Sequence, residues 1–169
     1  QQNRDILATQ NLSRAEIDGY IKNIRPLYEK VKTDENCKVD CILGLIKENF
    51  ADYSQKSMQY LGLAQQLNGQ WFREFLKYDP AVYLTKITLP IFAFNGDKDV
   101  QVQANQNLNA FRENMKKAGN TKYTLKIYNN LNHLFQPCET GAISEYEEIE
   151  TTFSEDVLED IYQWINTLK

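Results

Sequence analysis

The chain has 169 residues, of which 42% are hydrophobic, 12% aromatic and 25% charged, and its formal net charge is -4. This length suits one or two compact units and is enough to bury roughly 70% of the surface that the unfolded chain would expose. The weak negative charge and the absence of a long lysine or arginine run exclude nucleic-acid binding. No apolar run approaches the roughly 20 residues that cross a bilayer, so we expect no membrane span.

The three cysteines do not indicate a metal site. Cys37 and Cys41 lie close together and Cys138 stands alone, and the chain has a single histidine. A zinc site is therefore not expected, and no other cofactor is predicted. We expect Cys37 and Cys41 to be packed thiols; a disulfide between them, which would close a very small loop, is the less favoured alternative. The polar start QQNRD has the composition of neither a signal nor a transit peptide, and the compartment stays unassigned.

The first part of the chain predicts helices and contains no strand candidate. Ser13 and Glu16 have the spacing of a capping box, in which each residue bonds the backbone N–H of the other. Apolar residues then recur at helical spacing, although Pro26 lies inside the pattern and predicts a kink or a break. The predicted helical segments lie at 13–31, 42–53 and 61–76, and the last of them pauses near Asn68 and Gly69.

The second part predicts a strand, a helix and a second strand. Leu89–Phe94 is apolar on both faces, which suits a parallel strand covered by helices on both sides. Residues 103–118 predict a helix. Apolar and polar residues alternate in Tyr123–Tyr128, which predicts a second strand. We therefore expect a strand–helix–strand unit with parallel strands and a right-handed connection. A last helix begins after Ser154, and its expected buried stripe is Val157, Leu158, Ile161, Trp164 and Ile165.

An acid and a base follow the two predicted strands. Asp99 comes after the first strand, and His133, the only histidine of the chain, comes after the second. Because the carboxyl ends of neighbouring parallel strands meet at one edge of a sheet, we expect these side chains to lie close together. A carboxylate that accepts from a histidine N–H fixes its tautomer and stabilises the imidazolium formed in base catalysis. Asp97 is the second candidate acid, and its alternative interpretation is a turn residue.

These segments resemble the α/β-hydrolase superfamily, in particular bacterial serine esterases with a helical cap before the last two strands. YDPAVYLTKITLPIFAFNGDKDVQV resembles the penultimate strand and its G-x-x-D turn, and NLNHLFQPCETG resembles the histidine loop. EYEEIETTFSEDVLEDIYQWI resembles the closing helix region, so the resemblance covers residues 71–169 well and 1–70 only as a general helical cap. It implies a truncated α/β-hydrolase, with a cap at 1–77 and the last two parallel strands with flanking helices at 78–169.

The resemblance implies that Asp99 is the triad acid and His133 the general base of a serine-dependent ester or acyl hydrolase that needs no cofactor. The family's nucleophile motif, G-x-S-x-G, is absent from the chain. The family order of serine, acid and histidine places the nucleophile upstream of Gln1. We therefore expect the carboxyl-terminal part of a longer hydrolase, inactive alone. Cys138 is a remaining candidate nucleophile, for which a packed thiol is the favoured interpretation.

An incomplete sheet also predicts association. A two-stranded sheet is marginal in water, and its unpaired edges invite pairing, so we expect a homodimer, a swapped assembly or a complex with the absent part. The expected substrate of the full-length protein is a small-molecule acyl ester. Two alternatives stay open: a noncatalytic helical binding module on an α/β scaffold, and a thioesterase or peptidase relative, because one triad serves several acyl substrates.

Overall fold

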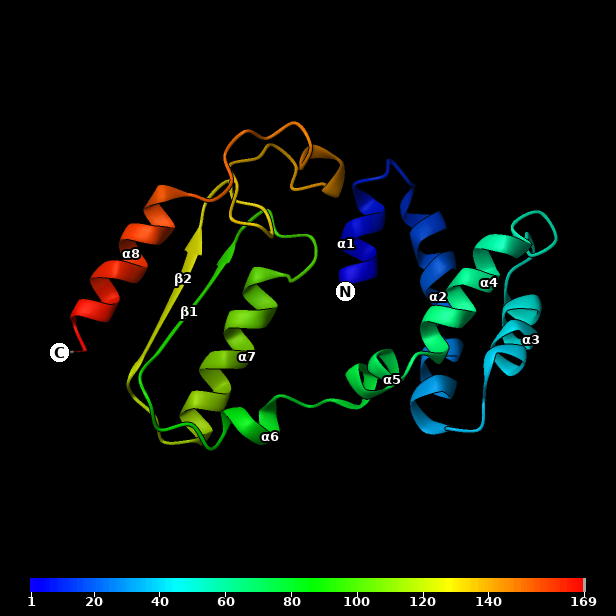
Figure 1. Cartoon of the computed structure of the whole chain (residues 1–169), viewed down its shortest axis with the longest axis horizontal. Helices are drawn as coiled ribbons and strands as arrows, with labels where there is room; N and C mark the ends of the chain where they lie inside the picture. The colour runs from blue at the N-terminus through cyan, green and yellow to red at the C-terminus, as the bar shows by residue number, and fades with distance from the viewer. Residues whose placement is uncertain (169) are drawn as a thin grey trace. The chain divides into compact units, whose positions relative to one another are not determined.

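The computed structural model describes residues 1–168, and the chain divides into two compact units (Figure 1). The helical unit comprises Leu12–Asp79. The strand unit comprises Gln1–Asn11 and the chain from Pro80 onward, so the first helix, α1 (Gln2–Ala8), belongs with the strands. The role of the helical segment as a cap stays a prediction.

The helical unit consists of four helices around one apolar core. Its elements are α2 (Arg14–Thr33), α3 (Val39–Asn49), α4 (Ser57–Asn68) and α5 (Gln70–Lys77). Apolar side chains that recur three and four residues apart share one helix face and supply the buried core. The core residues are Ile24, Leu27, Val31, Cys37, Ile42, Ile46, Phe50, Tyr60, Ala64 and Leu67.

Helix α2 begins as predicted but runs through its proline. The Ser13 hydroxyl accepts from the Glu16 N–H at 3.3 Å, and the Glu16 carboxylate accepts from the Ser13 N–H at 2.8 Å, which confirms the capping box. Of the kink or break predicted at Pro26, the break does not occur, because α2 continues without interruption to Thr33. Pro26 is exposed, as is Lys22 one turn earlier, so the carbonyl that loses its helical donor can bond water.

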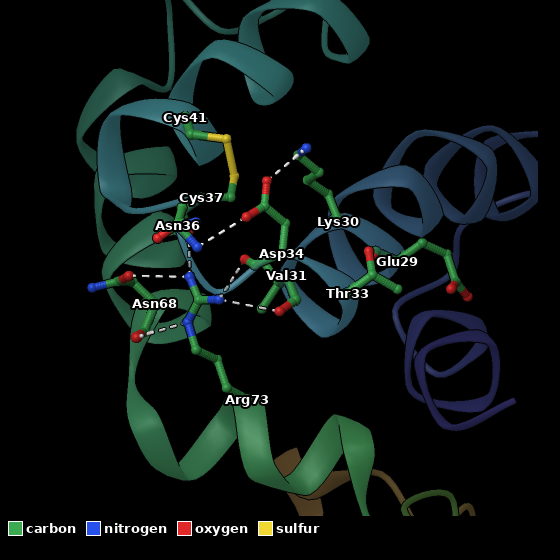
Figure 2. The surroundings of a disulfide bond; sticks show 10 residues. All are labelled: Glu29, Lys30, Val31, Thr33, Asp34, Asn36, Cys37, Cys41, Asn68 and Arg73. Carbon is green, nitrogen blue, oxygen red and sulfur yellow. Dashed lines mark hydrogen bonds and ion pairs between the residues drawn. A yellow bond between two sulfur atoms is a disulfide. The ribbon is translucent and has the colours of Figure 1, made fainter.

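Cys37 and Cys41 form a disulfide, so the expectation of two packed thiols is wrong (Figure 2). Cys37 precedes α3 and Cys41 lies in its first turn, which brings their Cα atoms to 5.1 Å, within the range that a disulfide bridges. The loop that the disulfide closes packs on the unit's core, because Cys37 is buried at 2% exposure.

The strand unit contains the predicted parallel strand pair. Strand β1 (Ile91–Gly96) pairs with β2 (Tyr123–Tyr128), and the register runs from Ile91 opposite Tyr123 to Gly96 opposite Tyr128. Helix α7 (Ala104–Lys117) connects the two strands along the chain. The remaining elements are α6 (Ala81–Leu84), the 3-10 helix η1 (Ile143–Glu145) and α8 (Glu155–Asn166).

Strand β1 begins two residues later than the apolar run predicts. Pro90 has no N–H to donate, so pairing starts at Ile91, whose N–H donates to the carbonyl of Lys122 at 2.9 Å. The preceding Leu89 is 71% exposed, and its carbonyl accepts from the side-chain amide of Asn120 at 2.9 Å. The apolar residues before Pro90 therefore form a tethered loop, and the strand extends instead through the polar Asn95.

The two helices beside the sheet lie against opposite faces (Figure 1). On one face Phe94 and Tyr128 form a small core with Val157 of α8, while Asn95, on the other face, contacts α7. The predicted stripe of α8 is only partly correct, because Leu158 and Ile165 are 54% and 50% exposed. A two-stranded sheet is too narrow to cover that stripe. No helix in the described part of the chain is long and apolar enough to cross a membrane.

Candidate active site

The candidate acid lies in a tight turn at the carboxyl end of β1. Asp99 is 6% exposed, and its Oδ1 accepts from the backbone N–H of Gln101 at 2.9 Å and of Val102 at 2.7 Å. Gly96 allows this turn to meet the histidine loop, because a Cβ at that position would lie 2.0 Å from the carbonyl oxygen of Leu131. The close approach of the Leu131 carbonyl therefore explains why the first position of the G-x-x-D motif is a glycine.

The candidate base lies in a loop that is organised by a fully buried amide. The Oδ1 of Asn132 accepts from the backbone N–H of Leu134 at 2.9 Å and of Gln136 at 3.0 Å. Its Nδ2 donates to the Gln136 side chain at 2.9 Å, and its backbone N–H donates to the Gln136 carbonyl. These bonds close the loop into a tight turn, whose Phe135 has a left-handed φ of 58°, and they fix the backbone that carries His133.

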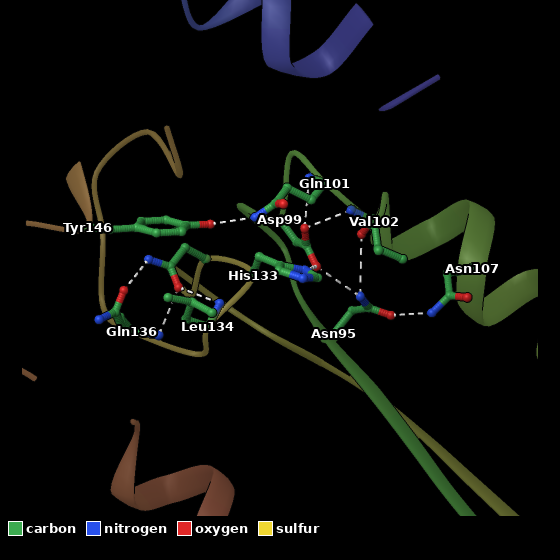
Figure 3. Close-up of polar contacts among 10 residues, drawn as sticks. Asn95, Asp99, Gln101, Val102, Asn107, His133, Leu134, Gln136 and Tyr146 are labelled. Atoms are coloured by element: carbon green, nitrogen blue, oxygen red, sulfur yellow. Dashed lines mark hydrogen bonds and ion pairs between the residues drawn. The ribbon is translucent and has the colours of Figure 1, made fainter. Parts of the chain in front are cut away.

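The structure brings the acid and the base together (Figure 3). Nδ1 of His133 lies 2.9 Å from Oδ2 of Asp99. An ionised carboxylate only accepts, so Nδ1 carries the proton and Nε2 of the neutral ring carries the lone pair. The His133 side chain is 37% exposed whereas that of Asp99 is 3% exposed, so a buried acid orients a base that a substrate can reach. This geometry can support proton transfer at Nε2.

The other two candidates have different surroundings. The Oδ1 of Asp97 accepts from the backbone N–H of Asn130 at 2.6 Å, which matches the interpretation of Asp97 as a turn residue. Burial and the Glu145 carboxylate raise the pKa of the Cys138 thiol, so this thiol is protonated at neutral pH. An activated cysteine nucleophile requires the opposite shift.

A third loop packs against the acid turn. The left-handed Gly141 approaches Lys98 so closely that a Cβ would lie 1.8 Å from the Lys98 carbonyl oxygen. The same loop carries Tyr146, whose hydroxyl accepts from the side-chain amide of Gln101 at 2.9 Å. Next to the acid turn lies an open cavity of about 510 Å³. It is lined by Asp5 and Ala8 of α1, by Thr9 and Asn11 after this helix, and by Asp97, Lys98, Asp99, Val100, Gln103 and Thr140. No group of acidic, cysteine or histidine side chains suited to a metal ion occurs in the described residues.

Sequence reasoning missed the amides that support the site. Asn95 donates to Oδ2 of Asp99 at 3.3 Å and accepts from Asn107 of α7 at 2.6 Å. A polar residue at the end of an otherwise apolar strand was the available signal for Asn95. The position directly before the sole histidine was the signal for Asn132. Neither signal by itself indicates which partner the amide contacts.

Two adjacent parallel strands with flanking helices, a G-x-x-D turn and a histidine loop define a part of the α/β-hydrolase fold. The sequence model of the prolyl oligopeptidase family matches residues 44–161, and the chain belongs to this family. It is a serine hydrolase family with the α/β-hydrolase fold. The matched region includes both Asp99 and His133. Comparisons with curated proteins and with solved structures found no match.

Proposed function

We propose that this chain supplies the acid and the base of a serine-dependent acyl hydrolase that acts on carboxylic esters. The observation that carries the proposal is the contact of 2.9 Å between Asp99 and His133 at the carboxyl ends of adjacent parallel strands. In the proposed reaction, Nε2 of His133 removes the proton of a serine hydroxyl and later donates it to the leaving group. Asp99 holds the ring and stabilises its charged form. This chemistry needs no metal and no organic cofactor.

The proposal places the nucleophile outside these residues. The five serines are Ser13, Ser54, Ser57, Ser144 and Ser154. None of them lies in the loop between β1 and α7, and the first serine after β2 is in η1. A nucleophile elbow requires a serine on a sharp strand-to-helix turn. The isolated chain is therefore expected to show no turnover of a short acyl ester and no labelling by a serine-directed fluorophosphonate; serine-specific labelling would contradict this.

The decisive experiment uses the protein that carries the nucleophile. The gene upstream of the codon for Gln1 is expected to encode G-x-S-x-G in the same reading frame. In that longer protein, Asp99→Asn should lower kcat by about 10⁴-fold, because the ring loses the partner that fixes its tautomer. Asp97→Asn is the matched control and should change kcat by less than about tenfold. Equal losses in both variants would contradict the specific role of Asp99 as the triad acid. An open reading frame that begins near Gln1 would favour a noncatalytic binding module.

The substrate class is tested by comparing two acyl compounds with the same acyl group. The matched family is named after a peptidase, prolyl oligopeptidase. An amide or peptide bond is therefore the alternative to the ester substrate that we propose. In the longer protein, kcat/KM should be higher for the ester than for the matched peptide. A peptide that is cleaved at least as fast as an activated ester would assign the protein to the peptidases, because esters are the chemically easier substrates.

The proposal of a homodimer rests on the unpaired outer edges of the two-stranded sheet and on the exposed apolar side chains of α8. Within the described residues β1 and β2 pair only with each other, and Leu158, Tyr162 and Ile165 form an exposed apolar stripe on α8. Light scattering of the isolated chain should give at least twice the mass of 19.7 kDa. Leu158→Glu should shift that mass toward the monomer, whereas Glu159→Gln, on the same helix, should not. A monomer at all concentrations would refute the association.

A further inference from the structure

A buried amide, Asn95, contacts the same carboxylate oxygen of the acid as the histidine (Figure 3). Asn95 is 5% exposed and is the last residue but one of β1. Its Nδ2 donates at 3.3 Å to Oδ2 of Asp99, the same oxygen that contacts Nδ1 of His133. The Asp99 carboxylate therefore receives two backbone donors on Oδ1, and an amide and a ring donor on Oδ2. A carboxylate has about four lone-pair sites, and all of them are used.

The orientation of the Asn95 amide is fixed by partners on both of its ends. Its Oδ1 accepts from Nδ2 of Asn107 at 2.6 Å, so its NH₂ group must face the opposite way. There it meets two acceptors, Oδ2 of Asp99 and the carbonyl of Val102, each at 3.3 Å. A flipped amide would place an oxygen against both acceptors and an NH₂ group against the donor of Asn107. The amide therefore has one satisfied orientation, which the Asp99 carboxylate and the Val102 carbonyl select and the donor of Asn107 on α7 completes.

We propose that Asn95 is a positioning residue of this site, anchored by Asn107, which holds the Asp99 carboxylate in the orientation that binds Nδ1 of His133. The inference rests on the proposed pairing of Asp99 with His133 and deepens it. Without Asn95, Oδ2 of Asp99 keeps only the ring as a donor, and the carboxylate is free to rotate about the oxygen that the backbone holds. The ring then loses the fixed acceptor that selects its tautomer.

The sole histidine makes the test specific, because nitrogen NMR of the labelled chain contains signals from one imidazole. The Nδ1 proton of His133 is expected to exchange slowly with water while Asp99 accepts it. In Asn95→Leu, which keeps a similar volume but no donor, this exchange should accelerate by about tenfold, the effect of losing one hydrogen bond. Asn107→Leu removes only the anchor and should give a smaller acceleration. Asn105→Leu, at an exposed position of the same helix, should give none.

Two further measurements separate positioning from a general loss of structure. The backbone N–H signals of Gln101 and Val102, which bond Oδ1 of Asp99, and the indole signal of Trp164 should keep their chemical shifts in Asn95→Leu. If that variant unfolds the strand unit, Asn107→Leu decides, because it leaves Asn95 and the strand intact. Unchanged ring exchange in every folded variant at positions 95 and 107 would overturn the inference.

The variant Asp99→Asn distinguishes failure of this inference from failure of the proposed function. It should abolish the protected Nδ1 proton, since an amide can no longer act as an ionic acceptor. If Asp99→Asn leaves the signal unchanged, the acid–base pair itself is wrong. If Asp99→Asn removes the signal while the variants at 95 and 107 retain it, the pair stands and Asn95 is only a packing residue.

Discussion

The helical unit and the strand unit are stabilised by different kinds of interaction. Most of the large side chains that are fully buried in the described residues belong to the helical unit, among them Ile24, Leu27, Ile42, Ile46 and Leu67. In the strand unit they are Met115, Val157 and Asn132, and large apolar side chains such as Leu158 and Ile165 stay exposed. The helical unit therefore has its own apolar core, whereas the strand unit relies more on hydrogen-bonded loops.

This difference explains how the candidate site keeps its geometry without a large core. Buried amides at positions 95 and 132 hold the acid and the base, and two glycines allow the loops to touch. Each such amide is costly to leave unpaired in a buried place, so the satisfied network specifies one arrangement. We expect perturbations of the helical unit to change stability and perturbations of the strand unit to change the site. The two tryptophans, Trp71 in α5 and Trp164 in α8, report on the two units separately.

The largest expected effect on stability comes from Arg73, a buried cation whose hydrogen bonds in the described residues go to backbone carbonyls and an amide (Figure 2). Its guanidinium donates to the carbonyls of Val31, Asp34, Cys37 and Asn68. The carbonyls of Val31 and Asp34 lie at the carboxyl end of α2 and that of Asn68 at the carboxyl end of α4, where the helix dipole favours a positive charge. The Cys37 carbonyl belongs to the disulfide loop before α3. Arg73 therefore joins two helix ends to the disulfide loop.

Arg73→Met should destabilise the helical unit by about 3 kcal/mol, because it leaves buried carbonyls without donors. The measurement is a urea titration that follows the two indole N–H signals by NMR. The midpoint from Trp71 should fall, and the midpoint from Trp164 should stay unchanged. Arg25→Met, at an exposed position of α2, is the matched control. A parallel fall of both midpoints would show that the two units unfold together and would contradict their separate stabilisation.

The disulfide should contribute less than Arg73. The loop from Cys37 to Cys41 is short, so the loss of entropy that it imposes on the unfolded chain is worth about 2 kcal/mol. Cys41→Ser should lower the Trp71 midpoint by that amount, and reduction of the wild-type chain by a phosphine should have the same effect. Cys138→Ser should leave the Trp71 midpoint unchanged. A disulfide variant as stable as the wild type would show that the loop is ordered by Arg73 alone.

Much of the fold could be predicted because its signals are local. The capping box at Ser13, the strand–helix–strand order and the parallel pairing follow from spacing and from strand composition. Predictions that depended on tertiary surroundings were less accurate. The start of β1 depends on the missing N–H of Pro90 and on the distant Asn120. Burial along α8 depends on how many strands lie beneath it, and this is why the exposure of Leu158 was not predicted.

The acid and the base of the candidate site could be predicted from the sequence, but the residues that hold them in place could not. Asp99 and His133 were selected by residue type and by position after a strand, and the structure brings their side chains into contact; their catalytic role stays a proposal. Asn95 and Asn107 lie on different elements, so nothing in the sequence connects them. The disulfide was missed for a similar reason, because the four-residue spacing does not reveal the backbone path that brings the two Cα atoms to 5.1 Å.

The smallest expected effect is a pH dependence of the strand unit. The carboxylate of Asp160 on α8 bonds Lys126 and the hydroxyl of Tyr128 on β2, and these bonds lower its pKa below the usual value. The unfolded chain therefore binds a proton at a higher pH than the folded chain. The stabilisation is present above the unfolded pKa of about 3.9 and is lost as the pH falls through the lower folded pKa. Because the groups are partly exposed, the loss should be below about 1 kcal/mol.

Urea titrations at about pH 6 and about pH 3 measure this pH dependence through the indole signal of Trp164. Asp160→Asn should lower the midpoint at the higher pH and reduce the difference between the two, because the amide does not titrate. Glu159→Gln, the neighbouring substitution on α8, should retain the wild-type difference. If Asp160→Asn leaves the difference unchanged, another group on the strand unit carries its acid sensitivity. Loss of the same difference at Trp71 would again couple the two units, since Asp160 bonds Tyr128 of β2, in its own unit.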